Sequence, residues 1–275
     1  MERTLVACRD FIVSDYLPAD LPLLILLRTS VGGADALSAM MSWWMLAMLA
    51  YPETQARGHA ELDAVVGRTR LPTFSDYRHL PYIRSMVKEL LRWRPLSPIM
   101  APHQATEDDW YEGMFIPKGT IFLANAWHMN RDPEIFGKNT DEYDPARYLD
   151  ASGDMAPGLF NLKREGHFTY GFGGRICVGR HTADNSLFIN IATLLWAMKF
   201  ERKRDASGRL LPLDVDGWLE AGVVVLVLFI TYHYRGANVS VSADVLSRSR
   251  SRSLHGSRRL LRCLHRNVSS RGYNP

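Results

Sequence analysis

The glycine-rich segment at residues 170–179, Tyr-Gly-Phe-Gly-Gly-Arg-Ile-Cys-Val-Gly, constrains the fold of this chain more than any other stretch. It places one cysteine, Cys177, among four glycines. Glycine adopts positive φ without strain and lets the backbone approach a ligand closely. The segment therefore predicts a tight turn that lies flat against a large planar group, with the cysteine sulfur directed at it.

A helix is predicted directly after this segment. Between residues 182 and 200, apolar residues recur at close to helical spacing: Ala183, Leu187, Ile191, Leu195 and Met198. Cys177 would then lie at the entrance to the helix, where amide N–H groups and the helix dipole favour thiolate over thiol. Arg175 adds a cation that can reach a carboxylate of the same ligand. A thiolate held in this way is a suitable axial ligand for haem iron.

The segment resembles the haem-binding loop of the cytochrome P450 family, whose pattern is Phe-x-x-Gly-x-Arg-x-Cys-x-Gly. Tyr170, Gly173, Arg175, Cys177 and Gly179 fall on this pattern, with tyrosine in place of phenylalanine. The resemblance implies that the cofactor is haem (iron protoporphyrin IX), that the Cys177 thiolate is its metal ligand, and that Arg175 holds a propionate. A lone cysteine is more often a small buried structural residue, but the matched neighbours favour the ligand.

Two further signatures of the family concern charged residues. A helix predicted over Asp76 to Arg94 carries Glu89 and Arg92 three positions apart, close enough to pair. Alone, such a pair is more often a solvated surface bridge. Glu-x-x-Arg matches the family, however, as does the segment at residues 144–148 that contains Arg147. The resemblance implies a buried network of Glu89, Arg92 and Arg147 that locks this helix to the segment before the cysteine loop.

A long apolar helix is predicted from about Thr29 to Ala50, with a weak point at Gly32 and Gly33. The residues at 32–35 resemble the oxygen-binding helix of the family, where an acid and an alcohol relay protons. Here only the acid, Asp35, is kept, because Ala36 occupies the position of the alcohol. We expect Asp35 to act catalytically by relaying protons through water. The alternative is a helix kinked for packing alone.

The rest of the core region predicts a fold that is mainly α with a small antiparallel β-sheet. A surface helix is expected over 52–66, with Ala60, Leu62, Val65 and Val66 turned inward. Short extended pieces are expected at 98–105, 110–111, 114–116 and 120–125. His103 lies in one of them. The resemblance places it against a haem propionate, and a structural histidine is the equal alternative.

Composition excludes several classes of protein. The three cysteines, Cys8, Cys177 and Cys263, are too few and too scattered for a disulfide framework. Nine arginines fall between 235 and 275, with one acid; removing them from the totals of 33 basic and 29 acidic residues leaves 24 and 28. The main body is therefore mildly acidic, and no nucleic-acid partner is expected. The longest apolar run, 222–230, is shorter than the roughly 20 residues of a membrane-spanning helix, so no membrane anchor is expected.

We divide the chain into three parts. Residues 1–27 carry no readable motif and stay unassigned. Residues 28–216 resemble a partial cytochrome P450 domain, and the resemblance implies that they correspond to the C-terminal, haem-side half of the family fold. Residues 217–275 hold a divergent apolar run followed by a Ser/Arg-rich tail that lacks apolar periodicity, which predicts disorder there.

Several short segments, among them Ile-Pro-Lys-Gly-Thr at 116–120, resemble segments of fungal monooxygenases of secondary metabolism, the group called O-methylsterigmatocystin oxidoreductase-like. The resemblance implies oxidation of a hydrophobic small molecule with dioxygen, electrons from an NADPH-dependent flavoprotein reductase, and a location at the endoplasmic reticulum membrane. Two alternatives stay open. One is a truncated, inactive remnant unable to enclose haem. The other is a zinc site formed by Cys177, His167 and His181, whose spacing fits no usual pattern.

Overall fold

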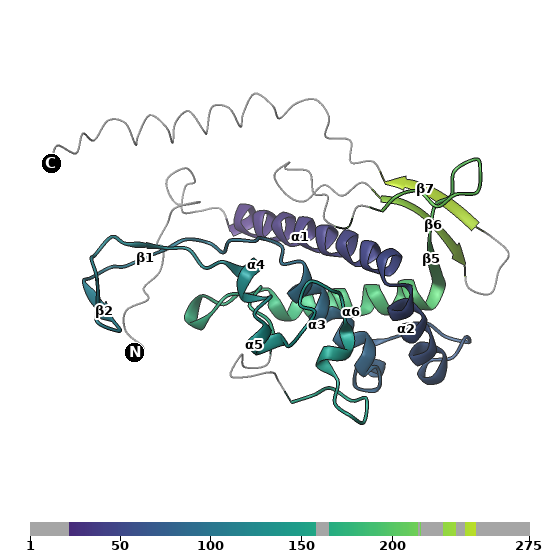
Figure 1. The fold of residues 1–275 in the computed structure, drawn as a ribbon, viewed down its shortest axis with the longest axis horizontal. Coiled ribbons are helices and arrows are strands. Elements are labelled where there is room, and N and C mark those ends of the chain that lie inside the picture. Colours follow the sequence, from purple (N-terminus) through teal and green to yellow (C-terminus); the bar gives the residue numbers. More distant parts are fainter. Residues whose placement is uncertain (1–21, 158–164, 214, 216–227, 235–239, 246–275) are drawn as a thin grey trace.

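The computed structural model describes residues 22–157, 165–213, 215, 228–234 and 240–245 (Figure 1). The chain is mainly α-helical with small antiparallel sheets, as predicted. The helices are α1 (Pro22–Ala50), α2 (Pro52–Val65), η2 (Phe74–His79), α3 (Pro81–Trp93), α4 (Ala126–Met129), α5 (Pro133–Phe136), η3 (Pro145–Tyr148), η4 (Gly173–Arg175) and α6 (Arg180–Ala197). The strands are β1 (His103–Gln104), β2 (Asp109–Tyr111), β3 (Met114–Ile116), β4 (Ile121–Phe122), β5 (Met198–Arg202), β6 (Leu228–Tyr234) and β7 (Ser240–Val245).

Helix α1 is the longest element and lies along α6 (Figure 1). It ends at Ala50 as predicted, but it begins at Pro22, earlier than the sequence suggested, and it continues through Gly32 and Gly33 without interruption. Its second half is buried: Trp44, Leu46, Ala47 and Met48 lose all contact with solvent. These side chains join those of α3 and α6 in one hydrophobic core.

The helix predicted over Asp76 to Arg94 is divided into η2 and α3. Pro81 explains the division, because proline lacks the N–H that an uninterrupted helix needs and is favoured at a first helical position. Helix α3 buries an apolar stripe at helical spacing, formed by Ile83, Val87, Leu90 and Leu91.

The inward face of α2 was predicted only in part. Leu62 and Val66 are buried, but Ala60 and Val65 are exposed. Thr54, Gln55 and Gly58 are buried instead. A Cβ at Gly58 would lie 2.9 Å from Leu195 Cδ1 of α6, so any larger residue at this position would force the Leu195 side chain to shift.

Two short strand pairs follow α3. β1 pairs with β4, and β2 pairs with β3, both antiparallel. The β2–β3 turn contains Glu112 and Gly113, with φ of 47° and 82°. Of the piece expected at 98–105, only His103 and Gln104 are in a strand. The predicted antiparallel sheet is thus two separate pairs.

After α6 the chain enters a three-stranded antiparallel sheet in the order β5-β6-β7. Met198, predicted as helical, is the first residue of β5. β6 and β7 lie within residues 217–275 and were not predicted as strands. The Ser/Arg-rich tail from 246 onward lies outside the described residues, as do residues 1–21. Among the helices that the structure describes, none has the length and apolar character needed to cross a bilayer.

Candidate functional site

The segment around Cys177 forms a tight loop that leads into α6. Gly171 and Gly173 have φ of 78° and 56°, the left-handed region that glycine tolerates. The Cys177 N–H donates to the Tyr170 carbonyl oxygen at 2.8 Å and closes the loop. Gly179 is the N-cap of α6, so Cys177 lies at the entrance to the helix, as predicted.

The outer face of this loop is open and apolar. Cβ atoms added at Gly171, Gly173 and Gly174 would meet no atom within 4 Å. Phe172 and Val178 expose 46% and 94% of their surface, and Cys177 and Arg175 are also exposed. A soft sulfur donor on an open glycine surface, with apolar side chains and a guanidinium beside it, fits haem: a flat apolar ring, an iron atom and anionic propionates.

Tyr170 anchors the start of the loop. Its side chain is buried, and its hydroxyl donates to Asp184 Oδ1 of α6 at 2.7 Å. Its ring also packs edge-on against His167, with 4.9 Å between the ring centroids. Burial raises the pKa of Tyr170, and the charge of Asp184 raises it further. The hydroxyl therefore stays protonated and remains a hydrogen-bond donor.

Glu89 and Arg92 form a fully buried ion pair on α3. Arg92 Nε and Nη2 each donate to one carboxylate oxygen of Glu89 at 2.7 Å, the bidentate geometry that favours arginine. Both side chains have an exposed fraction of 0%. Burial lowers the pKa of Arg92, but the hydrogen bonds and charge of Glu89 outweigh this and leave it above its usual value.

The same pair holds the segment that precedes the cysteine loop. Arg147 Nε lies 3.6 Å from Glu89 Oε1, and the Asp144 N–H donates to that oxygen at 2.9 Å. Arg147 also donates to the carbonyl oxygens of Lys138 at 3.2 Å and Asn139 at 3.1 Å. The structure thus brings together Glu89, Arg92 and Arg147, which we call the carboxylate clamp.

Arg92 also bonds directly to the backbone of that segment. Its Nη1 donates to the carbonyl oxygens of Asn130 and Thr140 at 2.8 Å, and its Nη2 donates to that of Glu142 at 3.0 Å. One arginine therefore fixes three carbonyl groups that are distant in the sequence. The family resemblance placed the arginine correctly, but these three carbonyl partners could not be assigned from the sequence.

Asn130 connects α3 to the segment before the cysteine loop, a role that no sequence motif indicated. Its side chain is fully buried. Asn130 Oδ1 accepts from the Phe168 N–H at 2.8 Å, and Nδ2 donates to Thr169 Oγ1 at 3.1 Å. Thr169 Oγ1 in turn donates to the Leu91 carbonyl oxygen at 2.6 Å. This chain of bonds connects α3 to the residues directly before the loop. An asparagine that begins Asn-Arg-Asp-Pro was the only signal.

Asp35 and His103 are not joined to the cysteine loop by any hydrogen bond or ion pair among the described residues. Asp35 is exposed on α1, and His103 is half-buried on β1. His167 is buried, and burial lowers its pKa to about 3. No three His, Cys, Asp or Glu side chains in the described part of the chain lie close enough together to hold a metal ion. The structure therefore does not assemble the zinc site considered as an alternative.

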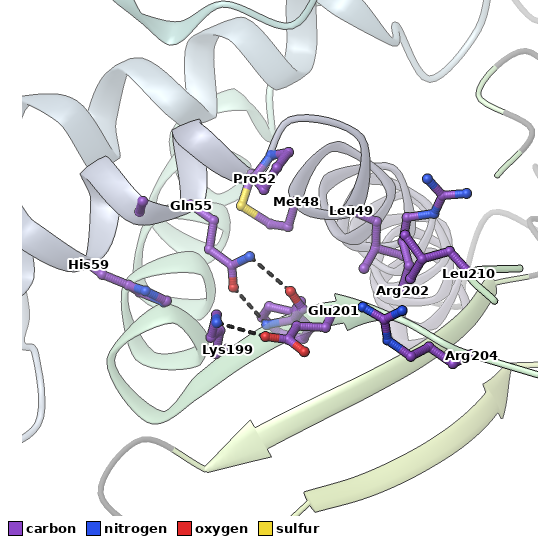
Figure 2. Close-up of a pocket in the computed structure, with 12 residues that line it drawn as sticks. Met48, Leu49, Pro52, Gln55, His59, Lys199, Glu201, Arg202, Arg204 and Leu210 are labelled. Carbon is purple, nitrogen blue, oxygen red and sulfur yellow. Dashed lines mark hydrogen bonds and ion pairs between the residues drawn. The ribbon is translucent and has the colours of Figure 1, made fainter. Parts of the chain in front are cut away.

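A pocket of about 330 Å³ lies away from the loop, between the end of α1, the start of α2, and β5 (Figure 2). Gln55 bridges to β5 there: its Nε2 donates to the Phe200 carbonyl at 3.0 Å, and its Oε1 accepts from the Phe200 N–H at 2.6 Å. Lys199 Nζ and Glu201 Oε1 pair at 2.6 Å. The pocket adjoins the C-terminal end of α6, whereas Cys177 precedes its N-terminal end. An 18-residue helix is roughly 27 Å long, so this pocket is separate from the loop.

Comparisons with known proteins agree with this geometry. A sequence profile described as cytochrome P450 matches residues 25–211. A cytochrome P450 monooxygenase of Armillaria gallica is 63% identical over 192 residues, which cover 70% of this chain and 37% of the relative. A cytochrome P450 monooxygenase of Postia placenta is 49% identical over 198 residues, 71% of this chain and 37% of the relative.

A solved structure, a zebra fish cytochrome P450 with abiraterone, superimposes with a TM-score of 0.62 and 30% sequence identity. The match covers 73% of this chain and 45% of the zebra fish chain. The chain thus spans less than half the length of the proteins that it matches.

Proposed function

The chain belongs to the cytochrome P450 family, and on this basis we propose that it is the haem-binding part of a haem-thiolate monooxygenase that oxidises a hydrophobic small molecule with dioxygen. The observation that carries the proposal is the position of Cys177, exposed at the N-terminal entrance of α6 on an open glycine surface. The carboxylate clamp behind it supports the same function, because it fixes the segment from which the loop emerges.

Haem, when bound, supplies the redox chemistry that activates dioxygen. In the proposed site, the Cys177 sulfur would hold the haem iron. Arg175 and His103 would hold the propionates, while Tyr170, Gly173 and Gly179 keep the loop in the conformation that presents the sulfur. Asp35 would move protons to the oxygen-binding side through water, without an adjacent alcohol, because residue 36 is alanine.

We also propose an electron source, a substrate class and a location for the protein. The electrons would come from NADPH through a flavoprotein reductase, and the substrate would belong to fungal secondary metabolism. Fungal monooxygenases among the relatives support this proposal. We also place the protein at the endoplasmic reticulum membrane, as is usual in the family. We expect no nucleic-acid partner.

Reconstitution with haem tests the proposed function. The expressed chain is titrated with haem, reduced, and exposed to carbon monoxide, and the absorption spectrum is recorded. We expect a thiolate-type Soret band in the wild-type chain and its loss in Cys177→Ser. A wild-type chain that folds but takes up no haem would favour the truncated remnant instead.

A further inference from the structure

The residue at the start of the cysteine loop departs from the family pattern in a way that creates a new contact. Tyr170 occupies the position of the usual phenylalanine. Phenylalanine would fill the same space without the hydroxyl, and that hydroxyl donates to Asp184 Oδ1 at 2.7 Å. The bond joins the first residue of the loop to the second turn of α6, which the loop leads into.

The same tyrosine also holds Cys177 through its backbone. The Tyr170 carbonyl oxygen accepts the Cys177 N–H at 2.8 Å. Residue 170 is therefore fixed by its side chain to α6 and fixes the cysteine by its main chain. If the hydroxyl lost its partner, the carbonyl that closes the loop would lose one of its supports.

A second contact supports the other side of Cys177. Arg180 Nη1 donates to the Cys177 carbonyl oxygen at 3.1 Å, and Arg180 Nε pairs with Glu165 Oε1 at 3.2 Å. The Glu165 carbonyl oxygen accepts from Lys88 Nζ of α3 at 2.7 Å. Both peptide groups of Cys177 are thus connected to ordered parts of the fold, one through Asp184 and one through Glu165.

We infer that Tyr170 and Asp184 form a positioning pair that holds the Cys177 backbone in its ligand-presenting conformation. The inference rests on the proposed function for its purpose, but the bonds of the pair are contacts within the chain itself. Asp184 is half-buried, so a variant that removes the hydroxyl leaves a carboxyl group without its donor. Leaving such a group unpaired is more disruptive than replacing both partners by apolar ones.

The test measures exchange of the Cys177 amide proton in the full chain without haem. Labelling with ¹⁵N-cysteine gives signals from three residues only, and Cys177→Ser identifies the relevant one. Tyr170→Phe and Asp184→Ala should each speed this exchange by about five- to tenfold, the effect of losing one hydrogen bond. In the double variant, the Cys177 amide should exchange no faster than in the more affected single variant, because both substitutions remove the same hydrogen bond.

Two control variants separate the inference from a general loss of structure. Asp184→Asn keeps an oxygen that accepts the tyrosine hydroxyl and should exchange like the wild type. Asn185→Ala, at an exposed position on the same helix, should do the same. In the haem-loaded chain, the thiolate-type fraction of the carbon monoxide complex should fall in Tyr170→Phe and stay unchanged in Asp184→Asn.

The inference would be overturned if the Cys177 amide exchanged as slowly in Tyr170→Phe as in the wild type. It would also be overturned if the effects of the two substitutions on this exchange added up in the double variant. If Asp184→Ala fails to fold, Tyr170→Phe alone decides, because it removes a single oxygen atom. The exchange is measured without haem. Failure of the chain to bind haem would therefore count against the proposed function and leave this result standing.

Discussion

Replacing Arg92 by alanine should destabilise the fold and abolish haem incorporation. Arg92 is fully buried, forms a bidentate pair with Glu89, and donates to three carbonyl oxygens. Among the residues that the structure describes, its loss leaves the buried Glu89 carboxylate with the Arg147 guanidinium, at 3.6 Å, and the Asp144 N–H as its remaining partners. Breaking a buried ion pair in this way costs about 3–5 kcal/mol. Domains are stable by only about 5–15 kcal/mol, so the loss is a large share of the total.

The free energy of unfolding is measured by urea denaturation, and haem uptake is measured by titration of the same samples. Arg78→Ala, which removes an exposed arginine on η2, is the matched control and should change stability by about 0.5 kcal/mol or less. Removing both charges in Glu89→Leu/Arg92→Leu should be less damaging than Arg92→Ala, because no carboxylate stays buried without Arg92. Arg147 loses Glu89 in this double variant but keeps the carbonyl oxygens of Lys138 and Asn139 as acceptors. A folded Arg92→Ala chain that binds haem like the wild type would refute the reasoning.

Three further predictions concern other parts of the site. Burial lowers the pKa of His167 from 6.5 to about 3, so the unfolded chain binds a proton at this histidine before the folded chain does as the pH falls. The free energy of unfolding should therefore drop between these pH values by up to about 1.4 kcal/mol per pH unit. Urea denaturation at several pH values should show a smaller dependence of this free energy on pH in His167→Phe, and an unchanged dependence would contradict the prediction. Gly166→Ala should cost about 1–3 kcal/mol, because φ is +75° and a Cβ would lie 3.0 Å from Tyr148 Cε1. Gly153→Ala is the control for backbone strain alone, because φ is +85° there and a Cβ would meet no atom within 4 Å. Equal losses of unfolding free energy in the two variants would disprove a steric contribution from Tyr148. If the proposed function holds, Ala36→Thr should raise the product formed per electron consumed, and an unchanged ratio would count against the proton relay through Asp35.

Local patterns predicted the fold well where a short stretch determines its own structure. The short extended pieces predicted at 110–111 and 114–116 are strands β2 and β3. Residue spacing alone also accounts for the buried apolar face of α3. The predicted helix over 76–94 is two helices in the structure, because Pro81 cannot continue a helix and begins a new one instead. The inward face of α2 was partly wrong because it depends on the approach of α6 at Gly58, a contact distant in the sequence.

In the candidate site, too, residues within short motifs could be predicted, whereas contacts between distant residues could not. Glu89, Arg92 and Arg147 could be named because each lies in a short motif. The bond from the Tyr170 hydroxyl to Asp184 could not, since no local pattern links a loop residue to a carboxylate on the next helix. Asn130 was missed for the same reason, because its partners Phe168 and Thr169 are brought close only by the tertiary fold.

The central claim is that the Cys177 sulfur binds haem iron, and X-ray absorption at the iron edge tests it most directly. The spectrum is recorded for the haem-loaded chain and for Cys177→His. The wild type should show scattering from one sulfur atom bound to iron, and the variant should show a nitrogen atom in its place. Sulfur scattering that persists in Cys177→His, or a wild-type spectrum without sulfur, would contradict the account.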